Sequence, residues 1–155
     1  MIITRAEKPD LKTILELQYS AYQSEAEILN DFTIQPLKQT YGDIEQEYGR
    51  GVIFLKAADK EENGNERIIG SVRAYIINNT AFIGKLIVHP EKQGQGIGTK
   101  LLSAIEKECP AARYELFTSD KSERNIRLYE RLGYVKFREQ KISALLTFVY
   151  LEKYR

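Results

Sequence analysis

Apolar and polar residues recur with a helical period in the first third of the chain, after a short predicted strand at residues 2–5. Residues 10–23 are a predicted helix, because apolar side chains fall on one side of a 3.6-residue repeat: Leu11, Ile14 and Leu15. Residues 24–36 predict an irregular or short helical stretch that Pro36 closes. A second helix is expected over about residues 37–48, ending before the glycines that follow.

The pattern then changes to runs of apolar, β-branched and aromatic residues. These runs predict strands over residues 51–58, 67–77 and 81–88. The connections are the hydrophilic segment 59–66 and the tight turn 78–80. Three strands joined by short polar turns predict an antiparallel meander.

Helical spacing returns after Pro90, where residues 96–109 predict an amphipathic helix that Pro110 ends. Residues 114–118 follow as a predicted strand. A crossover helix of this length normally joins parallel strands, so we expect 81–88 and 114–118 to be parallel.

The C-terminal part predicts one more helix and two more strands. The helix lies within residues 122–133 and ends at Gly133, a residue typical of a left-handed C-cap. The strands are residues 134–140 and 145–154. This order of elements predicts an α/β (α+β) fold with a mixed, mostly antiparallel sheet. No repeat or linker divides the chain, so residues 1–155 are predicted to form a single domain.

Charge and composition narrow the classes of function. The chain has 23 basic and 22 acidic residues and a net charge of +1, which argues against nucleic-acid binding through a strong overall field. Cys109 is the only cysteine, and we expect it to be a small buried residue rather than a catalytic thiol. The start of the chain has no signal or transit pattern, and no run is long and apolar enough to span a membrane. We therefore expect a soluble, cytoplasmic protein.

Three glycines at alternate positions, Gly94, Gly96 and Gly98, stand where the central predicted helix begins. Glycine costs about 1 kcal/mol relative to alanine in a helix, so the placement needs a reason. The spacing fits neither the P-loop, because Thr99 precedes Lys100, nor the dinucleotide fingerprint, whose third glycine falls at Thr99. A loop made flexible to join strand and helix is one interpretation. We favour an anion-binding loop, because helix N-termini present free N–H groups.

Two segments resemble the GCN5-related N-acetyltransferase (GNAT) superfamily. The segment "LIVHPEKQGQGIGTKLL" (86–102) resembles its coenzyme A signature, a strand followed by [QR]-x-x-G-x-[GA] and a helix. The segment "NIRLYERLGYVKF" (125–137) is similar to the superfamily's N-x-x-x-Y-x-x-x-G-[FY] pattern, through Asn125, Tyr129, Gly133 and Tyr134. The predicted order of elements matches from end to end. The resemblance implies a sheet flanked by about four helices, with its central parallel strands splayed where the coenzyme binds.

In such enzymes the loop binds the pyrophosphate of acetyl-CoA, which is a co-substrate, and no metal is expected. The resemblance implies that the backbone N–H groups of these residues hold it: Gln93, Gly94, Gln95, Gly96, Ile97, Gly98 and Thr99. It also implies that the preceding strand, at Leu86, Ile87 and Val88, pairs with the pantetheine arm as an added strand does. An N–H near Ile87 or Val88 then faces the thioester oxygen.

The resemblance implies that Tyr129 is the general acid, with its hydroxyl near the coenzyme sulfur. A phenol of pKa about 10 stays protonated at neutral pH. Packing in the core is an equally good interpretation of this side chain. Asn125 is expected to hydrogen-bond the pantetheine arm, or else to cap the helix. Three cations are phosphate partners or ordinary surface charges: Lys92, Lys100 and Arg124.

The acceptor amine needs a base, because a lysine-like amine of pKa about 10.4 is mostly protonated at pH 7. Many relatives carry a glutamate near the position of Gly84 in this chain. Glu25 and Glu27 are the substitutes, with Glu25 the candidate catalytic residue, and exposed helix-end carboxylates are the alternative. We expect a structural role for His89. Candidate walls of the acceptor pocket are Tyr19, Tyr22 and Tyr41.

The sequence thus predicts an acetyl-CoA-dependent N-acetyltransferase that transfers the acetyl group directly to a primary amine. A non-catalytic acyl-CoA-binding sensor is the alternative, favoured by the missing strand glutamate. A pure interaction protein leaves the glycine loop unexplained. No nucleic-acid or membrane partner is expected, and the apolar last strand, "LLTFVYL", is a candidate edge for a homodimer.

Overall fold

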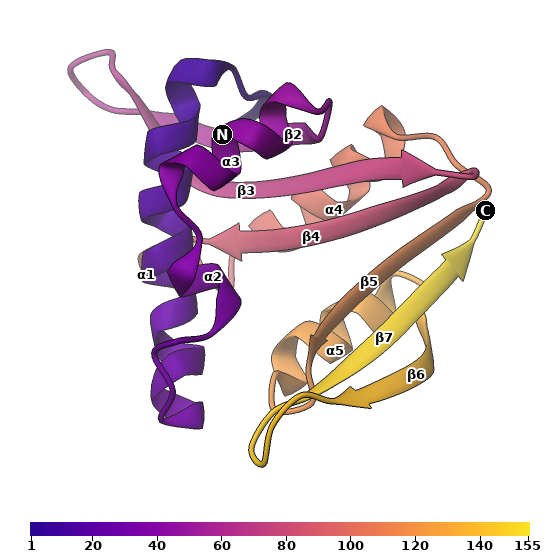
Figure 1. Cartoon of the computed structure of the whole chain (residues 1–155). Helices are drawn as coiled ribbons and strands as arrows, with labels where there is room; N and C mark the ends of the chain where they lie inside the picture. Colours follow the sequence, from indigo (N-terminus) through magenta and orange to yellow (C-terminus); the bar gives the residue numbers. More distant parts are fainter.

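Seven strands form one sheet in the order β1-β2-β3-β4-β5-β7-β6, in a computed structural model that describes residues 1–155 (Figure 1). Neighbouring strands are antiparallel except for β4 and β5, which are parallel. This confirms the predicted mixed sheet. The strands are β1 Ile2–Arg5, β2 Ile53–Lys60, β3 Glu66–Ile77, β4 Thr80–Val88, β5 Arg113–Ser119, β6 Val135–Lys141 and β7 Thr147–Tyr154.

The parallel strands β4 and β5 stay together only where they begin. Their register covers three pairs, Thr80 with Arg113, Ala81 with Tyr114 and Phe82 with Glu115. Beyond these pairs the two strands diverge toward their C-terminal ends (Figure 1). We call this divergence the splay. The predicted splayed pair is therefore present, and residues 83–88 of β4 have no partner on β5.

Helices cover both faces of the sheet. The α-helices are α1 Leu11–Leu29, α2 Gln35–Lys38, α3 Tyr41–Gly49, α4 Ile97–Glu108 and α5 Glu123–Arg131, and short 3-10 turns span Lys8–Asp10 and Pro90–Lys92. The first three lie together on one side, whereas α4 and α5 lie behind the sheet (Figure 1).

The first helix is longer than the sequence predicted. It continues past Gln23 to Leu29, because buried Ala26 and Leu29 extend its apolar stripe by more than a turn. Asn30 ends it in the left-handed conformation, with φ of 49°. Glu25 therefore lies on a helix and not in an irregular segment.

Pro36 begins a helix and does not close one, which corrects the prediction. It lies in the first turn of α2, where a missing N–H costs nothing. The helix predicted over residues 37–48 is in fact divided after Lys38. Thr40 then starts α3 through a reciprocal capping box with Asp43, a signal that was present in the sequence.

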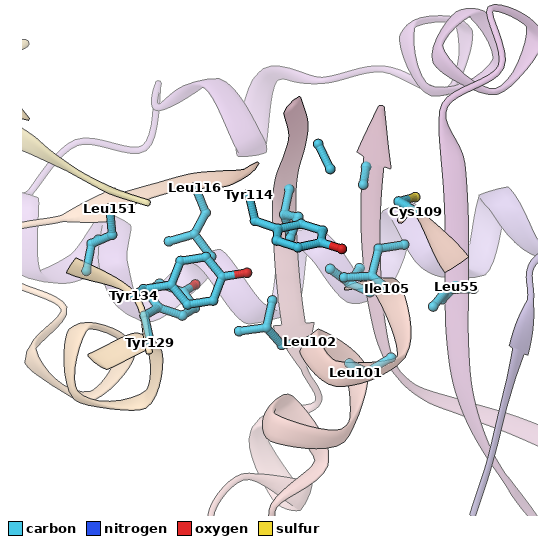
Figure 2. Packing of buried hydrophobic residues seen from close by; sticks show 14 of the residues in the cluster. Leu55, Leu101, Leu102, Ile105, Cys109, Tyr114, Leu116, Tyr129, Tyr134 and Leu151 are labelled. Carbon is cyan, nitrogen blue, oxygen red and sulfur yellow. The ribbon is translucent and has the colours of Figure 1, made fainter. Parts of the chain in front are cut away.

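The main core lies between the sheet and α4 and α5, with 19 buried residues. Figure 2 shows Leu101, Leu102 and Ile105 of α4 packed beside the aromatic rings of Tyr114, Tyr129 and Tyr134. Cys109 is fully buried at the end of α4, and burial raises the pKa of its thiol, as its predicted structural role requires. A smaller cluster lies under α1 and α3.

The last strand is not an edge of the sheet. β7 lies between β5 and β6, so both sides of its backbone are paired. The prediction that this strand offers a dimer edge is therefore wrong, and the edges are β1 and β6. None of the helices combines the length and the apolar character that crossing a membrane requires.

Candidate functional site

The glycine loop leads into α4 with unpaired backbone donors. Gly94 and Gly96 both have φ of 79°, a conformation that side chains disfavour. Gly96 precedes the helix without a side-chain cap, and the first α4 hydrogen bond runs from Lys100 N to Gly96 O over 3.1 Å. The N–H groups of residues 93–99 have no hydrogen-bond partner in the protein. This arrangement can bind an anion with main-chain donors.

Gly98 differs from the other two glycines. Its φ is ordinary, and a Cβ at this position would lie 3.4 Å from Leu128 Cδ2 and 3.9 Å from Val88 Cγ2. Both are ordinary van der Waals distances, so close packing does not account for this glycine. The loop conformation requires glycine only at Gly94 and Gly96, where φ is positive.

Of the three cations near the motifs, Arg124 is the one whose side chain hydrogen-bonds a loop residue. Its Nη1 donates to Gln93 Oε1 over 3.0 Å, and its Nη2 lies 3.4 Å from where a Cβ on Gly94 would stand. Lys92 pairs with Asp59 at 4.0 Å, and Lys100 is exposed beside a hollow of about 130 Å³. The guanidinium of Arg124 is therefore the best-placed positive charge for an anion in the loop.

Strand β4 contains an irregularity just before the loop. Its register with β3 shifts between the pairs Arg73–Gly84 and Ser71–Ile87, so β4 carries one extra residue there. Lys85 in this bulge has φ of 48°. The segment from Leu86 to Val88 follows, with the Ile87 side chain in the core and the strand edge toward β5 unpaired.

Tyr129 of α5 combines a core ring with an available hydroxyl. The side chain is 5% exposed, and its ring packs 6.2 Å from that of Tyr134 (Figure 2). The hydroxyl makes no hydrogen bond within the protein. Arg73 Nε is the one fully buried unpaired polar side-chain atom, so the Tyr129 oxygen keeps some contact with solvent. Burial, and then Tyr22 and Glu25, raise the pKa of Tyr129 and keep it protonated.

Tyr134, which follows Gly133, fixes the position of α5. The Tyr134 hydroxyl donates to Glu106 Oε2 over 2.8 Å, and Lys153 Nζ lies 3.0 Å from Glu106 Oε1. The Tyr134 N–H also donates to the Tyr129 carbonyl over 3.0 Å. These bonds tie the end of α5 to α4 and β7, and they hold the Tyr129 ring in place.

Asn125 is the third residue of α5, and Ser122 occupies the cap position. The alternative that Asn125 caps the helix is therefore wrong. Its side chain is half-buried and has no hydrogen-bond partner in the protein. Its donors and acceptor remain available to a ligand.

Two residues of α1 interact electrostatically with Tyr129. Glu25 is half-buried, burial raises its pKa, and its charge raises the pKa of both Tyr22 and Tyr129. The structure thus brings Tyr22, Glu25 and Tyr129 together. Glu27 is exposed.

The other two predicted acceptor tyrosines are used differently. The Tyr19 hydroxyl donates to the Gln39 carbonyl and connects α1 to the segment before α3. Tyr41 is 41% exposed in the first turn of α3.

Two cations near this cluster, Lys85 and Arg73, were not predicted as site residues from the sequence. Lys85 Nζ donates to Gln35 Oε1 over 2.7 Å, and burial, then the Arg73 charge, lower the pKa of Lys85 to about 8. Arg73 is buried and bonds Glu47 Oε2 at 2.6 Å and Gln18 Oε1 at 2.6 Å. The signal in the sequence was a cation in the middle of each apolar strand.

His89 lies outside this cluster. Its Nδ1 accepts from the Glu91 N–H over 3.1 Å and caps the turn before the glycine loop. It also borders a hollow of about 410 Å³ between α1 and β3. Two of the carboxylates that line it are paired, since Lys56 lies 3.0 Å from Asp10 and 3.1 Å from Glu66. No group of three or more His, Cys, Asp or Glu side chains is arranged to hold a metal ion.

Solved structures share this fold. The chain superposes on a ribosomal-protein-S18-alanine N-acetyltransferase from Escherichia coli with a TM-score of 0.77 and 15% identity, covering 99% of this chain and 92% of that one. It matches yncA, a putative acetyltransferase from Salmonella typhimurium with its cofactor acetyl-CoA, with a TM-score of 0.72 and 21% identity over 99% and 93% of the chains. The chain superposes on a phosphinothricin acetyltransferase from Sinorhizobium meliloti in complex with AcCoA with a TM-score of 0.75 and 22% identity, covering 99% of this chain and 87% of that one.

Sequence comparison gives the family. UPF0157 protein YqkA of Bacillus subtilis strain 168 is 28% identical over 126 residues, which are 81% of this chain and 34% of the relative. The chain thus spans about a third of that relative's length. A model of the acetyltransferase (GNAT) family matches residues 12–134, which include the glycine loop, the β4 bulge and Tyr129. The chain therefore belongs to the acetyltransferase (GNAT) family.

Proposed function

We propose that the chain transfers an acetyl group directly from acetyl-CoA to a primary amine. One observation carries this proposal. The unpaired N–H groups of residues 93–99 lie at the start of α4, directly after the strand that leaves its parallel partner. A diphosphate fits the donors, and an extended, peptide-like arm fits the free strand edge.

Acetyl-CoA binding uses main-chain atoms for most of its length. Residues 93–99 hold the diphosphate, and Arg124 adds positive charge beside them. The edge at Leu86, Ile87 and Val88 pairs with the pantetheine arm, and the free side chain of Asn125 bonds it from α5. An N–H near Ile87 or Val88 faces the thioester oxygen and stabilises its negative charge in the transition state.

The transfer itself needs a base and an acid. Glu25 accepts a proton from the acceptor ammonium, and burial supports this role by raising the pKa of the carboxylate. The amine nitrogen attacks the thioester carbon, the C–N bond forms and the C–S bond breaks. The leaving thiolate takes the proton of Tyr129, whose hydroxyl has no competing partner in the protein. The nitrogen loses its second proton as the amide forms, and this proton restores the Tyr129 hydroxyl through solvent, while Glu25 releases its proton to solvent. An amide and free coenzyme A are the products.

Thiol release tests the activity. Acetyl-CoA is incubated with the protein and a panel of amines that includes α-amino acids, polyamines and a lysine peptide, and free thiol is followed. Release above the rate of hydrolysis with at least one amine supports an enzyme. Coenzyme binding without release supports an acyl-CoA-binding sensor instead and contradicts the proposal.

Substitutions test the two catalytic roles. Tyr129→Phe removes one oxygen, and we expect kcat to fall about 100-fold with little change in the affinity for coenzyme A. In Glu25→Gln we expect kcat to fall about 100-fold or more, with the largest loss at low pH. Glu27→Gln is the matched control, because Glu27 lies on the same helix and is exposed. Full activity of Glu25→Gln would show that another group is the base.

A further inference from the structure

Lys85 occupies a backbone conformation that lysine disfavours. Its φ of 48° lies in the left-handed region, while its neighbour Gly84 has an ordinary φ. The positive φ thus falls on Lys85, although the glycine that would adopt it without strain is the residue just before it. A strained non-glycine residue at a bulge next to a candidate active site indicates that its side chain is needed there.

The ammonium of Lys85 has no charged partner in contact. Its hydrogen bond goes to the neutral Gln35 amide oxygen, over 2.7 Å. The nearby Arg73 charge opposes it, and Glu47 already pairs with Arg73 at 2.6 Å. This half-buried positive charge at the splay therefore has no ion-pair partner.

Glu25 is a negative charge that also lacks a partner. It is half-buried on α1 and forms neither a hydrogen bond nor an ion pair within the protein. Glu25 and Lys85 influence each other electrostatically, yet they do not pair directly. Two opposite charges without ion-pair partners suit a ligand that carries both signs.

The end of α1, next to Glu25, also contacts the C-terminal part of the chain. Buried Leu146, from the connection between β6 and β7, packs with Ala26, Leu29 and Ile34 at the end of α1. This cluster links the end of α1 to the β6–β7 connection, and the Tyr22 side chain packs against it. A segment packed beside Tyr22 favours a small acceptor over a side chain on a folded protein.

We propose that the acceptor is a small α-amino acid, with its ammonium at Glu25 and its carboxylate on the Lys85 ammonium. This inference rests on the proposed acetyltransferase function. Glu25 takes a proton from the α-ammonium, the nitrogen acquires the acetyl group, and the carboxylate stays bound to Lys85 throughout. Lys85 is a specificity-determining residue in this arrangement and takes no part in the proton transfers.

The test compares acids with amides of the same shape. Thiol release is measured with L-leucine, L-phenylalanine and L-methionine and with the corresponding amino acid amides. An α-amino group next to an amide has a pKa of about 8, so the amides are intrinsically the more reactive at neutral pH. We nevertheless expect at least one acid to have a kcat/KM at least about 10-fold higher than its amide.

Variants assign the preference to Lys85. In Lys85→Gln we expect the KM for the acid to rise about 10-fold or more and the kinetic constants for the amide to stay unchanged. The preference for the acid over the amide should then disappear. Lys85→Arg keeps the charge and should retain part of the preference. Lys12→Gln, an exposed lysine of α1, is the matched control and should behave as the wild type.

Two results would overturn the inference without touching the acetyltransferase activity. One is that amides, polyamines or a lysine peptide are better acceptors than every amino acid. The other is that Lys85→Gln lowers kcat equally for acids and amides, which would make the lysine part of the transfer chemistry. Absence of thiol release with every amine would instead contradict the proposed function itself.

Discussion

Lys85 bears two unfavourable features at once, a positive φ and an ammonium withdrawn from water. Neither is needed to form β4, since a glycine in the bulge and an apolar side chain on the strand would serve the fold better. Residues that lower stability in this way are typical of functional sites. The consequence can be measured without any substrate.

Lys85→Met is expected to raise the free energy of unfolding at pH 7 by about 1–2 kcal/mol, even though the bond to Gln35 is lost. The pKa of Lys85 is lowered to about 8 in the folded protein, so the unfolded chain binds more protons between that pH and the ordinary lysine value. The penalty is therefore fully present below pH 8 and disappears as the pH rises toward about 10.5. Urea unfolding at pH 7 and at pH 10 measures the difference in unfolding free energy between Lys85→Met and the wild type at each pH. An equal difference at the two pH values, or a less stable Lys85→Met at pH 7, would contradict this account.

At the residue scale, the sequence predicted more of the coenzyme side than of the acceptor side. Gly94, Gly96 and Tyr129 belong to contiguous motifs, and their local geometry follows from neighbours in the chain. Lys85 and Arg73 depend on which helix lies over the sheet, and a single sequence gives no such information.

At the scale of elements, strands were predicted better than helix ends. The meander and the β4–α4–β5 crossover follow from runs and spacing alone. The end of α1 depends on Ala26 and Leu29 packing against Leu146, which is more than a hundred residues away. Long-range contacts of this kind extend a helix beyond its local signals.

Helix α5 is held by one side-chain bond whose loss can be measured. Tyr134→Phe removes the donor to Glu106 in a site where the ring is 2% exposed. We expect the free energy of unfolding to fall by about 1.5 kcal/mol, since the bond involves a charged acceptor. Tyr154→Phe is the control, because Tyr154 is 69% exposed and has no partner for its hydroxyl. Equal stability of the two variants would show that the bond to Glu106 contributes nothing.

At the scale of the whole molecule, two halves of the sheet share only three residue pairs between β4 and β5. The cores behind the sheet join the halves from one side, and the Leu146 cluster joins them from the other. The Leu146 cluster thus lies on the α1 side of the splay. In the proposed function, the coenzyme lies along β4 and the small acceptor lies near α1.

Leu146→Ala tests this arrangement. The side chain is 8% exposed, so we expect a loss of about 2–3 kcal/mol in the free energy of unfolding. The KM of the acceptor should rise several-fold while the affinity for coenzyme A is retained, because the cluster is built on α1 and not on the glycine loop. Kinetics at saturating acetyl-CoA and calorimetry with coenzyme A separate the two effects. Unchanged acceptor kinetics in a folded Leu146→Ala would show that the cluster does not border the acceptor site.

The most direct measurement of the central claim is calorimetry of coenzyme A with the wild type, Gly96→Val and Gly64→Val. Both glycines have a positive φ, 79° and 84°, and open space around them, so valine strains the backbone similarly at each. We expect Gly64→Val to bind coenzyme A as the wild type does. We expect Gly96→Val to bind it at least about 10-fold more weakly, because the added atoms and the altered backbone disturb the diphosphate donors. Equal affinity of all three proteins, or no heat with the wild type, would contradict the central claim.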